Sequence, residues 1–241
     1  MSRTVTKTAF TVGLLIMLLA VPALGATVNK SIKIEADSEV DGATSVNGSI
    51  SVGENAVVTG NVKTVNGTIR VDRGASIEAA STVNGGVRLA AGVQSESLNT
   101  VNGSIKVGES ASIGGEIKAV NGRITVEKDS SVAGDVSNVN GQIELAGTEV
   151  GGNLKTVNGD IELADASVVK GDLIVEKSSG WGWGKSKRRK PRIVIGPGSR
   201  VEGKIVLERE VELFISATAE VGGVEGEMSM EDAVRFSGSR P

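Results

Sequence analysis

The residues best suited to chemistry lie together in one short segment, residues 177–191, and in the arginine that follows it. This segment holds both tryptophans of the chain, and six basic side chains fall between Lys185 and Arg192. Basic clusters beside aromatic rings bind anionic surfaces, because the cations attract phosphate or carboxylate groups and the indole rings anchor in the headgroup layer. The candidate contact residues are Trp181, Trp183, Lys185, Lys187, Arg188, Arg189, Lys190 and Arg192. The alternative is a solvated, Gly/Ser-rich excursion that binds nothing.

The chemistry that the chain lacks narrows its function further. It contains no histidine, cysteine or tyrosine, so it offers no imidazole base, no thiol nucleophile and no disulfide. The carboxylates fall at different offsets within the repeat described below; examples are Glu54, Glu109, Glu127, Glu144 and Glu162. We therefore expect no enzymatic activity, no cofactor and no metal site. A remote alternative is a carbohydrate-active enzyme that uses two carboxylates from neighbouring repeats.

A repeated tripeptide, Val-Asn-Gly, organises the chain. It occurs seven times at intervals of 18 or 19 residues, and a degenerate eighth copy stands at residues 28–30. The seven asparagines are Asn47, Asn66, Asn84, Asn102, Asn121, Asn140 and Asn158. Between the tripeptides, β-branched residues alternate with polar ones, as in Ile105/Val107 and Ile124/Val126. This pattern is typical of short strands separated by tight turns.

The length of the repeat decides the fold class. A unit of 18 or 19 residues has no room for a helix beside its strands. Strands this short bury an apolar face only by stacking on neighbouring units. We therefore predict an all-β, single-stranded parallel β-helix, or β-solenoid, of about ten coils and of either hand. Aromatic residues make up 2% of the chain, which fits thin aliphatic core layers with no space for a ring.

Stacking of the coils brings the repeated asparagines into one column. We expect their side-chain amides to join from coil to coil as a ladder. We also expect the glycine after each asparagine to adopt a backbone conformation that side chains with a Cβ avoid. The alternative interpretation of this column is an array of polar groups that binds a repetitive ligand.

The N-terminal segment predicts export. Residues 1–25 combine a positive start, an apolar run and small residues before a cleavage site between Gly25 and Ala26, the pattern of a secretory signal peptide. The alternative is an uncleaved segment that anchors the chain in the inner membrane. We expect the mature protein in the periplasm or cell envelope.

The remaining chain divides into a solenoid and a C-terminal segment. Residues 26–225 are predicted to form the solenoid, from which residues 177–191 leave along the asparagine edge. Residues 226–241 are predicted to form a polar tail or cap. We expect Phe214 and residues 228–236 to close the C-terminal end, where unpaired strand edges would otherwise invite another chain.

Two bacterial families are similar to this repeat. Residues 193–205 and 50–62 resemble coils of bactofilins, which are polymer-forming cytoskeletal proteins. The Thr-Val-Asn-Gly-x-Ile units at residues 64–69 and 156–161 resemble repeats of adhesin-type β-solenoid domains of bacterial envelopes. The resemblance spans roughly residues 28–223 and implies a parallel β-helix, with end-to-end filaments in the bactofilin case. Neither family carries catalytic residues to this chain.

Together these features predict an exported, non-enzymatic scaffold that forms a rigid rod in the bacterial periplasm or cell envelope. Its expected partners are further copies of itself, in an oligomer or filament. The alternative function is an adhesin-like binding module that contacts anionic lipid or polysaccharide through the Trp/basic segment. Nucleic acid is not expected as a partner, because export separates the protein from it.

Overall fold

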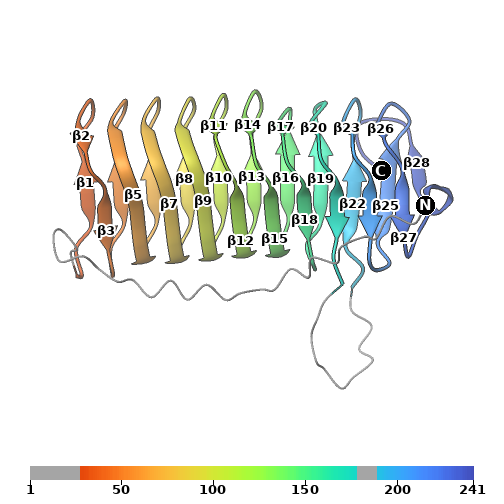
Figure 1. Cartoon of the computed structure of the whole chain (residues 1–241), viewed down its shortest axis with the longest axis horizontal. Helices are drawn as coiled ribbons and strands as arrows, with labels where there is room; N and C mark the ends of the chain where they lie inside the picture. Colours follow the sequence, from red (N-terminus) through yellow and green to blue (C-terminus); the bar gives the residue numbers. More distant parts are fainter. Residues whose placement is uncertain (1–27, 178–188) are drawn as a thin grey trace, which may run out of the picture.

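The computed structural model describes residues 28–177 and 189–241, which form a rod of stacked coils (Figure 1). It confirms the predicted all-β parallel solenoid of about ten turns. The predicted signal peptide lies outside the described residues, and so do Trp181, Trp183, Lys185, Lys187 and Arg188. No helix in the described ranges has the length and apolar character that crossing a membrane requires.

One side of the rod is a sheet of 11 parallel strands, to which each coil contributes one strand. We call this sheet the first column. Its members are β1 (Ile32–Ile34), β4 (Ile50–Val52), β6 (Ile69–Val71), β8 (Val87–Leu89), β10 (Ile105–Val107), β13 (Ile124–Val126), β16 (Ile143–Ala146), β19 (Ile161–Ala164), β22 (Arg192–Ile195), β25 (Glu212–Ser216) and β28 (Val234–Phe236).

The other sides of the rod are two further columns of parallel strands. The second column holds β2 (Glu39–Val40), β11 (Ser112–Ile113), β14 (Ser131–Val132), β17 (Glu149–Val150), β20 (Val168–Val169), β23 (Arg200–Val201) and β26 (Glu220–Val221). The third holds β3 (Ala43–Ser45), β12 (Ile117–Asn121), β15 (Val136–Asn140), β18 (Leu154–Thr156), β21 (Leu173–Val175), β24 (Ile205–Leu207) and β27 (Val224–Gly226). Three long strands run through both columns: β5 (Val57–Asn66), β7 (Ser76–Asn84) and β9 (Gln94–Asn102).

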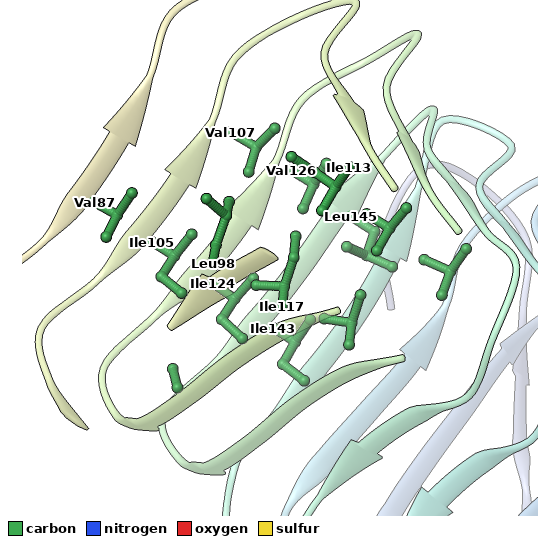
Figure 2. Packing of buried hydrophobic residues seen from close by; sticks show 14 of the residues in the cluster. Val87, Leu98, Ile105, Val107, Ile113, Ile117, Ile124, Val126, Ile143 and Leu145 are labelled. Carbon is green, nitrogen blue, oxygen red and sulfur yellow. The ribbon is translucent and has the colours of Figure 1, made fainter. Parts of the chain in front are cut away.

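Equivalent residues of the first column stack in register along the rod. Ile105 of β10 pairs with Ile124 of β13, and Ile124 pairs with Ile143 of β16. Alternation then sends these side chains inward and the residues between them outward. Figure 2 shows the resulting aliphatic layers, in which isoleucine, leucine and valine side chains from successive coils fill the interior. Nearly all of these side chains are fully buried, so apolar burial stabilises each interior coil in the same way.

The long strands distinguish the early coils, residues 47–101, from the late coils, residues 102–226. In the late coils a glycine column separates the second strand column from the third. The amide of Gly134 donates to the carbonyl of Gly115 at 2.9 Å, and that of Gly152 donates to Gly134 at 3.1 Å. Two early coils lack this corner residue, since Ile77 and Ala79 of β7 pair with Ser95 and Ser97 of β9 without a break. Their strands therefore continue through the corner, which they turn with two consecutive outward residues, as at Glu78 and Ala79.

The glycines of the Val-Asn-Gly turns serve a different purpose from the one expected. Of these seven glycines, Gly141 alone has a φ in the positive region, at 130°. The expectation of a special backbone conformation is therefore wrong for the others. A Cβ on Gly103 would overlap the carbonyl oxygen of Gly85 in the preceding coil. Glycine is needed because stacked turns approach each other too closely for a side chain.

The C-terminal end of the core is covered by the last described segment. The strand β28 pairs in parallel with β25, and it follows a 3-10 turn, η1 (Met230–Asp232). Met228, Met230 and Ala233 pack against the core at this end. Phe214 does not join them, because it alternates with the buried Leu213 and Ile215 and so lies on the outer face. The expectation that Phe214 closes the end is therefore wrong.

Candidate binding surfaces of the rod

The repeated asparagines form one continuous ladder. Each Nδ2 donates to the Oδ1 of the asparagine one coil earlier, from Asn158 back to Asn29, over distances of 2.6 to 3.0 Å. All the hydrogen bonds point the same way, so they polarise one another. Because the side-chain amides bond to one another, few of their hydrogen-bonding groups remain for a ligand.

Two further contacts hold this edge of the rod. The Arg209 guanidinium donates to Oδ1 of Asn158 at 2.9 Å and to the carbonyl of Val157 at 3.2 Å, which closes the C-terminal end of the ladder. Beneath the asparagines, buried threonines such as Thr100 donate to a turn carbonyl of the preceding coil, here Gly85 at 2.9 Å. The threonine of the repeat is therefore a structural donor.

The described ends of the inserted segment are held against this edge. Lys177 lies one coil beyond Asn158, and its amide donates to Glu208 at 3.1 Å. On the other side, Arg189 donates to both carboxylate oxygens of Asp160 at 3.1 and 2.8 Å. These hydrogen bonds raise the pKa of Arg189 above its ordinary value. Both described ends of the insertion therefore lie at the asparagine edge.

The other two described candidates of this segment also contact the rod. The Lys190 ammonium lies 2.7 Å from Glu210, and this hydrogen bond lowers the pKa of Glu210. The Arg192 guanidinium lies 4.8 Å from the centre of the Phe214 ring, a cation–π contact. Arg189, Lys190 and Arg192 thus anchor the insertion. The five remaining candidates, from Trp181 to Arg188, lie outside the described residues.

Acidic side chains stand beside the exit of the insertion. Burial raises the pKa of Glu176, and the neighbouring charge of Glu208 raises it further. Lys155 acts in the opposite direction but more weakly. Two acidic side chains, Glu176 and Glu208, therefore lie near each other where the basic segment leaves the rod.

A second side-chain ladder follows the glycine corners of the late coils. Asp135 Oδ1 accepts from the amide of Asn153 at 2.7 Å, and Asn153 Oδ1 accepts from the amide of Asp172 at 2.9 Å. Asp172 in turn accepts from the amide of Lys204 at 2.8 Å. Burial pushes the pKa of Asp135 upward, but hydrogen bonds from Lys155 and Asn153 outweigh it and lower the pKa. This ladder stabilises the corners.

A shallow groove of 390 Å³ lies over the early coils, on the outer side of β5, β7 and β9. Its lining is mostly small or polar, and Glu78 and Glu96 contribute two carboxylates. No group of three or more acidic side chains in the described ranges is arranged to hold a metal ion.

The outer face of the first column carries charged residues that sequence reasoning overlooked. Arg70, Arg88 and Lys106 occupy the middle positions of β6, β8 and β10, and all three are exposed. The signal was present in the sequence, because the middle residue of each Ile-x-Val triplet must point outward.

The fold places the chain in the class of parallel β-solenoid repeat proteins. Its edge is built from an asparagine ladder and its outer faces carry the charged side chains. No family model, curated protein or solved structure matches the chain.

Proposed function

We propose that this protein is an exported, non-enzymatic scaffold that acts as a rigid rod in the bacterial periplasm or cell envelope. The observation that carries the proposal is the uninterrupted stacking of one short coil over the whole described chain. Each coil is tied to the next by a strand ladder and a buried aliphatic layer, and from Asn29 to Asn158 also by a side-chain amide. Such a one-dimensional structure resists bending and holds its two ends at a set separation, which is what a spacer requires.

The two ends of the rod support a self-assembling form of this scaffold. At the C-terminal end, Met228, Met230 and Ala233 cover the core. At the other end, β1, β2 and β3 are the first strands of their columns in the described part of the chain. Strand edges pair readily with another chain, so we propose that copies associate through the N-terminal coil.

Light scattering and electron microscopy over a range of concentrations test this function. The full chain should form elongated particles that pair end to end as the concentration rises. A variant that ends at residue 226 uncovers the other end and should form longer filaments. A strictly monomeric full chain at high concentration, with no change on truncation, would count against assembly. Cell fractionation tests export, because the proposal requires the chain outside the cytoplasm.

The alternative function is an envelope-binding module that uses the Trp/basic segment. One observation favours it: Arg189 and Lys190 fasten the segment to Asp160 and Glu210, so the segment has a defined base on the rod. Both tryptophans lie in this segment, so anionic vesicles or lipopolysaccharide should shift their emission. Replacing Lys187, Arg188, Arg189 and Lys190 with serine should abolish the shift. Unchanged emission with every anionic envelope component would remove the alternative.

A further inference from the structure

A row of basic side chains runs along the outer face of the first column. Register places Arg70 opposite Arg88, and Arg88 opposite Lys106. Neighbouring strands lie about 4.8 Å apart, so three cations follow one another at this interval along the rod axis. Ser51 precedes them in the same row and Thr125 follows them.

Two of these cations, Arg70 and Arg88, form no ion pair with any of the described residues. Like charges directly opposite each other destabilise a sheet, and the late coils relieve this with diagonal pairs. Lys106 lies 2.7 Å from Glu127, which is one coil on and two residues further along the strand direction. The equivalent positions for Arg70 and Arg88 are Ala90 and Gly108. No ion pair or side-chain hydrogen bond within the described ranges involves either arginine.

The surroundings of the row leave the cations accessible. The residues two positions before them are Thr68, Gly86 and Ser104, and those two positions after Arg88 and Lys106 are Ala90 and Gly108. Asp72 is the one carboxylate among these flanking positions. The strip is therefore a flat floor of small residues and hydroxyl groups with cations along its middle.

We propose that this strip binds a linear acidic polysaccharide with a carboxylate on each sugar. Arginine binds carboxylates through two parallel hydrogen bonds, and the small residues admit flat sugar rings beside the guanidinium groups. A single exposed ion pair contributes little. A polymer that presents carboxylates at regular intervals engages several cations at once, and the later contacts form at high effective concentration. This inference is independent of the scaffold function, and it concerns a different surface from the Trp/basic segment.

Binding of labelled polygalacturonate to the full chain at low ionic strength tests the proposal. The paired substitution Arg70→Thr with Arg88→Thr should weaken binding about tenfold, since each arginine contributes one carboxylate contact. Threonine already occupies this row at position 125, so the strands accept it. The matched control is Arg200→Thr, which removes an exposed cation that pairs with Glu220 in the second column. It should change affinity less than twofold.

Three further substitutions change the row without removing an arginine. Ala90→Glu should give Arg70 the partner that Glu127 gives Lys106, and should weaken binding about threefold. Glu127→Ala should release Lys106 and tighten binding about twofold. Ser51→Arg should lengthen the row and tighten binding about threefold. Melting temperatures of all variants separate loss of binding from loss of fold.

Several results would overturn the inference. Unchanged affinity in the double arginine variant would do so, as would tighter binding by Ala90→Glu. Full binding by the double variant together with loss of binding in Lys187→Ser/Arg188→Ser would place the polysaccharide on the insertion instead. Equal binding of poly-glutamate or duplex DNA, with the same dependence on Arg70 and Arg88, would show that the row recognises charge alone and would remove the polysaccharide assignment.

Discussion

The early and late coils share one core but differ at their corners and on their surfaces. In the late coils, stacked glycines form the corners, and side chains such as Asp135 and Lys155 join across neighbouring coils. In the early coils, β7 and β9 run through the corner, and no ion pair forms within residues 47–101, all of which are described. Many charged side chains of the late coils therefore form ion pairs with one another.

This difference shows which parts of a repeat are free to vary. The buried Ile-x-Val positions continue through both regions, because every coil must cover the apolar layer of its neighbour. The asparagine ladder also crosses from the early into the late coils, as far as Asn158. The outward charged positions cover no apolar layer, so their side chains can vary from coil to coil. Where diagonal partners are missing, as for Arg70 and Arg88, the surface is available for another molecule.

The largest expected effect comes from the corner glycines. Gly152→Ala should lower the free energy of unfolding by about 2–3 kcal/mol, because a Cβ there would come within 2.7 Å of the Gly134 backbone. Chemical denaturation measures the change. Ala79→Ser, at an early corner where the strand is continuous, should be nearly neutral. Equal costs at the two positions would show that the corners do not differ as described.

A smaller effect, of opposite sign, is expected at the buried position under the ladder. The early coils have Thr64, Thr82 and Thr100 there, but coil six has Asn138, which donates to Gly122 at 2.7 Å. Its Oδ1 is buried and has no partner among the described residues. Asn138→Thr should raise the free energy of unfolding by about 1 kcal/mol, since it removes the unsatisfied acceptor and keeps a donor. A lower thermal midpoint would contradict this account.

The late corner carboxylates should make stability depend on pH. The pKa of Asp135 is lower in the folded chain than its ordinary 3.8, because hydrogen bonds from Lys155 and Asn153 outweigh burial. Its contribution is therefore complete above this value and is lost as the pH falls through the lowered pKa. This side chain is 32% exposed, so solvent screening limits its contribution and we expect less than about 1 kcal/mol. Asp135→Asn should reduce the stability difference between neutral and strongly acidic solution.

The control for that titration is Asp41→Asn in the first coil, where no side-chain hydrogen bond to Asp41 occurs in the described ranges. It should leave the acid sensitivity as it is in the native chain. The same loss of acid sensitivity in both variants would show that the corner ladder is not its source.

The smallest effect concerns Arg70, one of the two arginines of the basic row that form no ion pair with the described residues. Ala90→Glu should raise the free energy of unfolding by about 0.5 kcal/mol at low salt, because it offers Arg70 a diagonal partner. Added salt should remove the gain by screening the pair. Thermal melting at two ionic strengths measures this. A gain that survives high salt would have another cause, such as strand propensity.

The fold could be predicted from the sequence because the length of the repeat sets which residues pair between neighbouring coils. The Ile-x-Val triplets and the asparagines recur at intervals that match the pairing of Ile105 with Ile124 and of Asn102 with Asn121. Sequence reasoning failed where a residue's role depends on a neighbour one coil away. The turn glycines are needed for close approach between coils, and Phe214 lies under Arg192 on the outer face.

The candidate sites divide in the same way. The composition of the Trp/basic segment marks it in the sequence, but the pairing of Arg189 with Asp160 joins residues separated by 29 positions. The sequence alone does not show that Arg70 and Arg88 lack ion-pair partners among the described residues, because each arginine could pair with residues on the strands before and after its own. Pairing depends on what stands diagonal to Arg70 and Arg88, and this follows from the register.

The sequence by itself determined the class of fold, the column of asparagines and the exclusion of aromatic rings from the core, because each follows from period and composition. The tertiary structure decided which charged side chains form ion pairs and which, among the described residues, do not. Stacking sets each side chain beside residues one coil away, and ion pairs form or fail according to that neighbour. Lys106 with Glu127, and Arg70 beside Ala90, are the two outcomes of one geometric rule.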